Sequence, residues 1–464
     1  MTTPDDGQAA SSARLLESLH GRAWLRSAWR ALPRPLRDAA LRLLTIRLRA
    51  RTAFPRTAAW RRWKAPGPAA LHVQGAALDA AGGVNILGYI HGQFGLAEAA
   101  RMYARALIEN GVPVALADID LALPHGWNDD SLSSYLDPTL PHPVCIIFVN
   151  PDYLEQALAS IGKARLHGRH IIACWFWELE SIPASWLPAL DLVDEILVAT
   201  GFVEQAVSRV TDKPVLKVPM PLSGIGDSGL QRVDFGLDED AFVFLFSFDF
   251  SSRMERKNPL GVIAAFRAAF PPERSDVQLL LKTSNGYRYP HWLKIVLDAA
   301  AGDPRILVRD AIIDREHLAA MQRCCDAYVS LHRAEGFGMG LAECMAHGRP
   351  VIATGWSGNM EFMDADSAAL VDYRMVGLTD AEYPGGQGQR WAEPDIAHAA
   401  RWMRSLADDR DLAARLGTRG QHAVTTTLSP RRAAEAVVAR LGELRSQRAA
   451  TSGSSAVPAV KGTP

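Results

Sequence analysis

Short apolar runs alternate with helical stretches along most of this chain. Mainly apolar runs of four to six residues occupy positions 84–89, 145–149, 171–175, 241–246, 279–282, 306–309, 328–332 and 351–354. Runs this short and this apolar are typical of strands buried on both faces of a parallel sheet. Between them, segments such as residues 97–107 carry apolar residues at helical spacing. The alternation predicts an α/β fold with parallel sheets.

The length of the chain, 464 residues, favours two domains, each with its own core. Two prolines within residues 219–222 favour an extended hinge between these domains. Asp395 is expected to cap a helix over residues 396–406. We expect five parts: an extension (1–83), a first domain (84–222), a second domain (223–400), C-terminal helices packing back toward the first domain (401–449), and a disordered tail rich in Ser, Gly, Ala and Pro (450–464).

The stretch that carries most information about chemistry is Glu335-Gly336-Phe337-Gly338-Met339-Gly340-Leu341-Ala342-Glu343. Its three glycines allow the backbone to turn closely around a ligand. The residues after them read as the start of a buried helix, whose free N–H groups attract anions. A carboxylate at each end can accept hydrogen bonds from hydroxyl groups. The stretch is therefore suited to a ligand with both phosphates and a polyol, such as a sugar nucleotide.

A second glycine turn, Gly358-Asn359-Met360-Glu361, follows the apolar run at 351–354. Together with the nonapeptide, it resembles the retaining glycosyltransferases of the GT-B fold, family 4, whose hallmark is two glutamates seven residues apart in an EGFG-type sequence. The resemblance implies two Rossmann-like domains facing across a cleft. The first is then the acceptor-side domain, and the second binds the nucleotide sugar. A basic helical N-terminal extension precedes them.

The resemblance also implies roles for the residues of the nonapeptide. Glu335 is expected to contact the transferred sugar, and Glu343 to hold the ribose hydroxyls. The donor diphosphate is expected over the turn between them, against Gly336, Phe337, Gly338, Met339, Gly340 and Leu341.

A basic segment after the run at 241–246 is expected to grip the diphosphate as it leaves. Lys257 falls where the family has its lysine. The family's arginine does not align cleanly, so Arg253 is the first choice and Arg256 the second. The alternative is an exposed basic turn that opens a helix.

A glycine turn also follows the first strand, at His91-Gly92-Gln93-Phe94-Gly95. Such turns face the ligand in doubly wound folds, and the resemblance implies that Gly92 and Gly95 contact the sugar and its phosphate. The alternative is a tight turn without a ligand. By the same resemblance, Arg309 and the residues up to Asp314 border the nucleobase.

Other features of these two domains have simpler interpretations. Trp175, Trp177 and Trp186 could stack on an acceptor sugar, although core packing is the usual role of tryptophan near a strand. Many family members have a histidine after the run at 171–175, but this chain has Glu178 nearby instead. The five cysteines show no metal-binding spacing and are expected to be buried free thiols.

The net charge of −1 conceals a strongly basic N-terminal segment. Residues 13–64 contain fourteen Arg or Lys against two acidic residues. Part of this segment, with Leu36, Leu43 and Ile46 on one helical face, could rest on an anionic membrane or pack on the protein's own acidic body. Nothing favours nucleic-acid binding, and no apolar run is long enough to span a bilayer. A cytoplasmic protein, either free or peripheral on the inner face of the membrane, fits this pattern.

We therefore predict a retaining hexosyltransferase that uses a UDP- or GDP-sugar and a glycan or lipid-linked glycan acceptor, as in polysaccharide biosynthesis. No Asp-x-Asp metal motif lies near the expected cleft loops, so no metal or other cofactor is expected. Two alternatives remain open at this stage. One is an epimerase or phosphorylase on the same fold, and the other is a sugar-nucleotide-binding membrane protein without catalytic activity.

Overall fold

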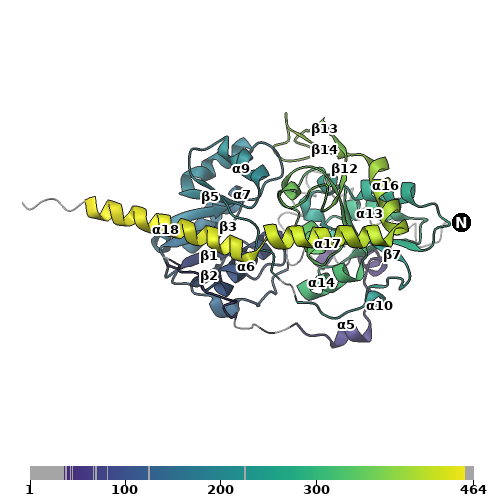
Figure 1. The fold of residues 1–464 in the computed structure, drawn as a ribbon, viewed down its shortest axis with the longest axis horizontal. Helices are drawn as coiled ribbons and strands as arrows, with labels where there is room; N and C mark the ends of the chain where they lie inside the picture. Colours follow the sequence, from purple (N-terminus) through teal and green to yellow (C-terminus); the bar gives the residue numbers. More distant parts are fainter. Residues whose placement is uncertain are drawn as a thin grey trace, which may run out of the picture. The chain divides into compact units, whose positions relative to one another are not determined.

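The computed structural model describes residues 36, 39–41, 43, 45–65, 67, 71–80, 82–123, 126–223 and 226–454. The chain divides into two compact units. The larger unit comprises residues 1–65 and 225–423, and the smaller unit comprises residues 66–224 and 424–464. Each unit contains a six-stranded sheet (Figure 1) in which every strand pair is parallel. The predicted α/β fold with parallel sheets is confirmed.

The sheet of the smaller unit has the strand order β2-β1-β3-β4-β5-β6. Its central strands are buried along their whole length, which explains their continuous apolar sequences. The strands are β1 (Val84–Gly88), β2 (Val114–Asp118), β3 (Val144–Phe148), β4 (His170–Cys174), β5 (Glu195–Val198) and β6 (Val215–Lys217).

Helices follow most strands of this unit: α6 (Gly95–Glu109), η1 (Ser133–Tyr135), α7 (Pro151–Ile161), α8 (Lys163–Leu166), η2 (Ala184–Leu192) and α9 (Gly201–Ser208). The last helix, α18 (Pro430–Ser454), packs along α6 (Figure 1). Arg440 of α18 pairs with the buried Glu195 of β5 at 2.6 Å. Residues 450–454, expected within a disordered tail, continue α18, and residues 455–464 lie outside the described residues.

The sheet of the larger unit has the strand order β12-β11-β10-β7-β8-β9. Its longest strands, β7 and β8, pair over eight positions. The strands are β7 (Phe242–Asp249), β8 (Val277–Ser284), β9 (Ile306–Asp310), β10 (Ala327–Ser330), β11 (Val351–Thr354) and β12 (Ala369–Val371), and a separate antiparallel pair consists of β13 (Tyr373–Gly377) and β14 (Arg390–Pro394).

The helices of the larger unit are α4 (Ile46–Arg51), α5 (Ala58–Arg62), α10 (Arg232–Phe235), η3 (Phe250–Ser252), α11 (Met254–Lys257), α12 (Pro259–Ala269), η4 (Gly286–Arg288), α13 (Pro290–Ala300), α14 (Arg315–Cys324), α15 (Met339–Ala346), η5 (Gly358–Glu361) and α16 (Ile396–Asp408). Helix α17 (Arg410–Thr427) continues past the end of this unit at residue 423. The predicted cap of α16 is confirmed, since the Asp395 side chain accepts a hydrogen bond from His398 N at 2.9 Å. None of the helices within the described residues combines the length and the apolar character that crossing a bilayer requires.

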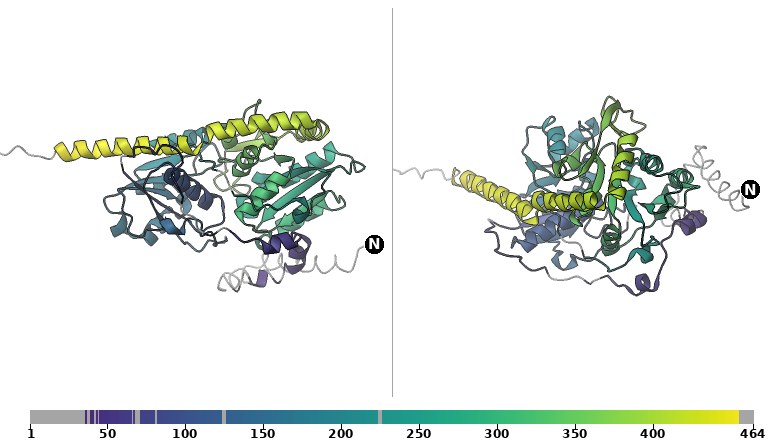
Figure 2. Two further views of the ribbon diagram at one scale, coloured as in Figure 1. Left: turned by 60° about the horizontal axis from the view of Figure 1, so that its bottom comes forward. Right: turned by 45° about the vertical axis from the view of Figure 1, so that its right-hand side comes forward.

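Part of the basic N-terminal segment is an integral piece of the larger unit. Thr52 O accepts a hydrogen bond from Asp310 N at the end of β9, at 3.0 Å. The Thr57 hydroxyl, which also caps α5, donates to the carboxylate of Asp234 in α10. Residues 45–65 therefore lie against the strands and helices of this unit, as the purple helices in Figure 2 (left) show.

Aromatic packing holds this segment in place. Trp60 is only 5% exposed, and its ring lies 5.3 Å from Phe54, 5.5 Å from Phe235 and 4.6 Å from His317. Trp63 lies on the same histidine ring, at 4.3 Å. Burial of such large rings is the main source of stability at this contact. The segment is thus held by hydrophobic packing, although its sequence is dominated by arginine.

We expect Trp60→Ala to destabilise the larger unit by about 3 kcal/mol, because it removes a large buried ring and leaves a cavity. Trp63→Ala is the matched control, since Trp63 is only half-buried and its ring packs on the same histidine. Urea denaturation monitored by circular dichroism would give both free energies of unfolding. Equal losses for the two variants, or a loss below about 1 kcal/mol for Trp60→Ala, would show that the segment is only loosely attached.

Candidate functional site

The two glycine turns predicted from the sequence lie directly against each other. A Cβ atom at Gly358 would lie 2.2 Å from Gly336 O, and Gly358 N donates a hydrogen bond to Glu335 O at 2.8 Å. Gly338, the residue before α15, has a φ of 95° in the left-handed region, which glycine adopts without strain. The close approach of the two turns therefore requires glycine at these positions.

A buried histidine and a buried asparagine connect the two turns through their side chains. His332 Nε2 lies 3.0 Å from Asn359 Oδ1, and both side chains are fully buried. Asn359 Nδ2 also donates to Thr354 O at the end of β11, at 3.1 Å. Burial lowers the pKa of His332 below its usual range, so this histidine is neutral at physiological pH. The hydrogen bond between these two side chains therefore holds the two turns together.

Glu335 is the centre of a buried charge cluster. Its side chain is 9% exposed, and the ammonium of Lys257 donates a hydrogen bond to its Oε1. Arg256 Nη1 lies 3.1 Å from its Oε2. The backbone of Glu335 is held as well, because Glu335 N donates to the Ser357 hydroxyl at 2.8 Å. Both the position and the direction of this carboxylate are therefore fixed.

These contacts determine the charge of Glu335. Burial alone would raise its pKa, but the charges of Lys257 and Arg256 outweigh burial and lower the pKa to about 2. Glu335 is consequently a carboxylate at neutral pH and cannot donate a proton. It can accept hydrogen bonds and stabilise positive charge.

The structure brings Arg256 and Lys257 to Glu335, whereas it leaves Arg253, the first choice from the sequence, exposed. Arg256 is buried and also donates to Ala334 O at 2.8 Å. Arg253 precedes the short helix α11 with a φ of 65°, whereas Arg256 and Lys257 lie within that helix. Arg256 is thus engaged within the cluster, and Arg253 is exposed to solvent.

Glu343, the second glutamate of the motif, is 2% exposed and lies on α15. Its Oε2 accepts a hydrogen bond from Gln322 Nε2 at 2.8 Å. Arg315 Nη2 lies 2.8 Å from its Oε1, but this contact is ionic, and Oε1 receives no aligned hydrogen bond from the described residues. Sequence reasoning missed both partners. The sequence signal that could have identified them is their spacing of seven residues, which places both side chains on one face of α14.

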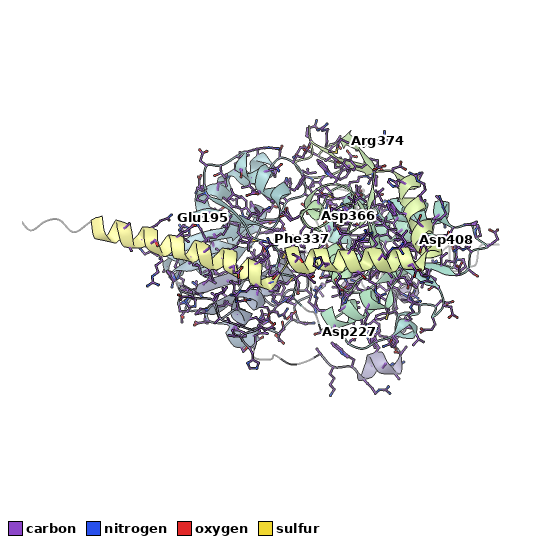
Figure 3. All side chains as sticks on the ribbon, in the orientation of Figure 1. Glu195, Asp227, Phe337, Asp366, Arg374 and Asp408 are labelled. Atoms are coloured by element: carbon purple, nitrogen blue, oxygen red, sulfur yellow. The ribbon has the colours of Figure 1, made fainter. Side chains whose placement is uncertain are left out.

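The other predicted residues of the turn differ in how far their side chains are buried. Phe337, labelled in Figure 3, and Leu341 are buried, and the Phe337 ring packs 5.1 Å from Phe362. A Cβ atom at Gly340 would lie 2.8 Å from the Tyr328 hydroxyl. Met339 is partly exposed. Phe337 and Leu341 therefore belong to the core through their side chains, so only their backbone groups are suited to contact a ligand.

Polar residues that the sequence analysis passed over gather where β7, β8 and β9 end. Asp249 accepts hydrogen bonds from Ser284 Oγ at 3.1 Å and Asn285 Nδ2 at 2.7 Å. Asp310 accepts a hydrogen bond from Gly286 N at 3.0 Å. Burial lowers the pKa of the Lys282 ammonium, and the carboxylates of Asp249 and Asp310 oppose that shift. The carboxyl ends of parallel strands are where open α/β sheets bind ligands.

Arg309, the expected neighbour of the nucleobase, lies near the carboxyl end of β9 beside Lys282 of β8. It is partly buried, and burial lowers its pKa. The next residue, Asp310, is hydrogen-bonded to the N-terminal segment at Thr52. No contact among the described residues joins Arg309 to Glu335 or Glu343.

The predicted loop of the smaller unit joins β1 to α6. Gly92 is tightly packed, since a Cβ atom there would lie 2.7 Å from the Phe94 ring and 3.0 Å from Tyr89 O. Gly95 has open space at the corresponding position. His91 Nδ1 lies 2.8 Å from Asp129 O. The packing explains the glycine at 92, and the open space at 95 leaves room for a ligand.

The three tryptophans near β4 and the five cysteines belong to the core. Trp175, Trp177 and Trp186 are at most 5% exposed and pack on one another, with ring centroids 4.6 Å apart for Trp177 and Trp186. Core packing is therefore the correct interpretation of this cluster. All five cysteines are buried and free, as predicted. In the part of the chain that the structure describes, no group of three or more His, Cys, Asp or Glu side chains is arranged to hold a metal ion.

Comparison with known families places this site in context. Residues 246–380 match the family described as glycosyl transferases group 1. The chain is also 28% identical over 182 residues to the trehalose synthase of Rubrobacter xylanophilus, and the match spans 38% of either protein. The matched family segment includes Arg253, Lys257, Glu335 and Glu343.

Two solved structures have similar folds. Sucrose-phosphate synthase from Thermosynechococcus elongatus superposes with a TM-score of 0.55 at 18% identity, covering 80% of this chain and all of the other. HepE from Anabaena, solved with UDP and glucose, has a TM-score of 0.56 at 14% identity and covers 78% of this chain and 99% of the other. At these identities the likeness shows a shared fold.

The ionisation of Glu335 gives a testable pH dependence. The pKa is about 2 in the folded protein and 4.5 for an unperturbed glutamate, so the paired carboxylate stabilises the fold above pH 4.5. That contribution, about 3 kcal/mol, is lost as the pH falls toward 2. Glu335→Gln lacks it and also leaves Lys257 and Arg256 without their counter-charge.

We therefore expect the difference in the free energy of unfolding between the wild type and Glu335→Gln to be largest near neutral pH. It should narrow as the pH falls from about 4.5 to about 2. Urea denaturation of both proteins at a series of pH values measures this difference. Parallel pH curves would contradict the charge assignment of Glu335.

Proposed function

We propose that this chain, which belongs to the glycosyl transferases group 1 family, transfers a hexosyl unit from a UDP-sugar to a glycan or lipid-linked glycan acceptor, with retention at the anomeric carbon. The observation that supports it most directly is the buried Glu335, held by Lys257 and Arg256 beside the glycine turn that starts α15. The family match covers this segment. The presence of UDP in the HepE structure supports UDP as the nucleotide.

The donor diphosphate would lie over the N-terminus of α15. Gly338 has no side chain to cap that helix, so the first N–H groups and the helix dipole are suited to an anion. Negative charge grows on the diphosphate as the bond from its oxygen to the anomeric carbon breaks. Lys257 and the exposed Arg253 would stabilise this charge, and one such donor typically contributes about 3 kcal/mol to lowering the barrier.

Glu335 would act at the sugar as a fixed carboxylate. Its low pKa excludes a role as general acid at neutral pH, and both of its oxygens are engaged by cations. These features favour hydrogen bonding to a sugar hydroxyl and stabilisation of oxocarbenium character over covalent attack. Arg256 would then position Glu335, since it bridges that carboxylate and Ala334 O.

Glu343 would bind the ribose. One of its oxygens accepts a hydrogen bond from Gln322, and the other receives no aligned hydrogen bond from the described residues. A carboxylate has about four lone-pair positions, so capacity remains for ribose hydroxyls. Arg309, near the carboxyl end of β9, would border the uracil. In the smaller unit, the loop with Gly92 and Gly95 would contact the sugar and its phosphate.

The product distinguishes this proposal from its rivals. The protein would be incubated with UDP-glucose, UDP-galactose, UDP-N-acetylglucosamine and GDP-mannose, with and without a panel of glycan and lipid-linked acceptors. A transferase gives an α-linked product from an α-linked donor, read by the anomeric proton coupling. An isomerised donor without acceptor indicates an epimerase, consumption of phosphate indicates a phosphorylase, and binding without turnover indicates a non-catalytic protein.

We expect UDP to stabilise the wild type by about 2.7 kcal/mol at 100 times its dissociation constant. In Glu343→Gln, UDP affinity should fall about tenfold or more, because a hydrogen bond to a charged group is lost. Thermal-shift titration with UDP measures both. Glu393→Gln is the control, since Glu393 also pairs with an arginine, Arg333, and should keep full affinity. Unchanged UDP binding by Glu343→Gln would remove Glu343 from the nucleotide site.

We further propose that the N-terminal segment docks on an anionic membrane surface. Leu36, Leu43 and Ile46 are 57%, 71% and 61% exposed. The nearby Arg49 and Arg51 are exposed as well. Exposed apolar side chains beside exposed arginines suit a layer of anionic lipid headgroups. Packing on the protein's own body accounts for Thr52, Phe54 and Trp60, which are buried, but leaves this apolar face uncovered.

We expect the double variant Leu43→Asp/Ile46→Asp to bind phosphatidylglycerol vesicles at least about tenfold more weakly than the wild type, since it removes two apolar contacts and adds two negative charges that the anionic surface repels. Val73→Asp, at a residue that is 49% exposed elsewhere in the chain, is the control. Vesicle co-sedimentation measures the bound fractions. Point variants are preferable to truncation, because residues 45–65 also stabilise the larger unit. No difference between the variant and the wild type would refute membrane docking by this face.

A further inference from the structure

Arg101 of α6 is a buried arginine that the proposed chemistry does not use. Its side chain is 1% exposed. Its Nη1 donates hydrogen bonds to Ile90 O at 2.8 Å and to Gly92 O at 2.7 Å. Its Nη2 donates to Glu98 Oε2 at 2.6 Å, and its Nε lies 3.2 Å from Asp129 Oδ2. One guanidinium group therefore holds the β1–α6 loop, the first turn of α6 and the segment around Asp129.

The two hydrogen bonds from Arg101 to carbonyl groups fix the orientation of two individual peptide groups in the loop. The Ile90–His91 peptide donates its N–H to Asp118 Oδ1 at 3.2 Å, while its carbonyl accepts from Arg101. The Gly92–Gln93 peptide donates its N–H to Gly126 O at 2.9 Å, while its carbonyl also accepts from Arg101. Each plane is hydrogen-bonded on both sides. Rotation of either one would break a buried hydrogen bond on each side.

The buried charges around Arg101 are better suited to positioning the loop than to stabilising the fold. Arg101 and Glu98 are both almost fully buried, and Asp129 is 14% exposed. Desolvating such groups costs several kcal/mol, and well-packed apolar side chains of similar volume often stabilise a fold as well or better. An apolar residue cannot orient two carbonyl groups, whereas the planar fork of arginine can. The cluster is therefore suited to setting the geometry of the loop.

We infer that Arg101 is a positioning residue for sugar transfer, which holds the loop of residues 90–95 in the conformation that receives the sugar end of the donor. This inference rests on the proposed function. The nucleotide contacts proposed above all come from the larger unit, whereas Arg101 acts on a loop of the smaller unit. Its loss should therefore affect the reaction step more than the binding of UDP.

The test is Arg101→Lys, which keeps the positive charge but cannot bridge two carbonyls and two carboxylates. With UDP-glucose and an acceptor from the transfer panel, or water where none reacts, we expect kcat to fall about tenfold or more. The KM for UDP-glucose and the UDP-induced thermal shift should stay within about threefold of the wild type. Hydrogen–deuterium exchange should be faster in residues 90–95 and unchanged in the larger unit.

Arg105→Lys is the matched control. Arg105 lies on the same helix, and its Nη1 is 3.9 Å from Glu98 Oε1, but it is 24% exposed. It should keep wild-type kcat and loop exchange. Should Arg101→Lys not fold, Glu98→Gln keeps the arginine and the shape of the cluster, and a smaller loss of kcat with unchanged KM is expected.

Three results would overturn the inference: wild-type kcat in Arg101→Lys or in Glu98→Gln, an equal loss of UDP binding and kcat, or unchanged exchange in residues 90–95. Failure of the proposed function has a different signature. In that case the wild type turns over no sugar nucleotide, while the exchange experiment still reports whether Arg101 holds the loop.

Discussion

The site in the larger unit depends on one buried ionic contact between the segments that follow two neighbouring strands. Lys257 and Arg256 follow β7, Glu335 follows β10, and these two strands pair in the centre of the sheet. Burying three charged groups is costly, and the cost is offset only when they meet in good geometry. The contact therefore ties the loops at the carboxyl ends of two adjacent strands into a single arrangement. Any ligand bound there meets a preformed charge pattern.

Neutral hydrogen bonds make that arrangement possible. Asn258, with a φ of 55°, caps α12 through Gly261 N and donates to Leu331 O at 2.9 Å, which joins the segments that follow β7 and β10. The neutral His332 contacts Asn359 and so connects the next glycine turn. Neutral hydrogen bonds thus hold the same loops that carry the charged groups. This division explains how a loop-built site can be rigid.

Local patterns predicted the strands and the start of α16, because apolar runs and capping residues act within a few positions of the chain. The glycine motif was also visible, since close backbone approach leaves glycine as its sequence signal. Which of Arg253 and Arg256 contacts Glu335 could not be predicted from the sequence. Left-handed backbone at Arg253 and at Asn258 changes the direction of the side chains between them, and neither residue type requires that conformation. Arg315 and Gln322 were missed because their partner, Glu343, lies on another helix.

The N-terminal segment illustrates a limit of composition as evidence. Its arginines suggested an extension that precedes the two domains, yet Phe54, Trp60 and Thr52 join it to the larger unit. The larger unit is thus assembled from two pieces of chain, separated by residues 66–224. Even a flexible loop of that length would cost only about 4–5 kcal/mol of entropy to close, and residues 66–224 are themselves folded. Burial of a few aromatic rings is enough to offset it, so the buried side chains of Phe54 and Trp60 determine where an otherwise basic segment belongs.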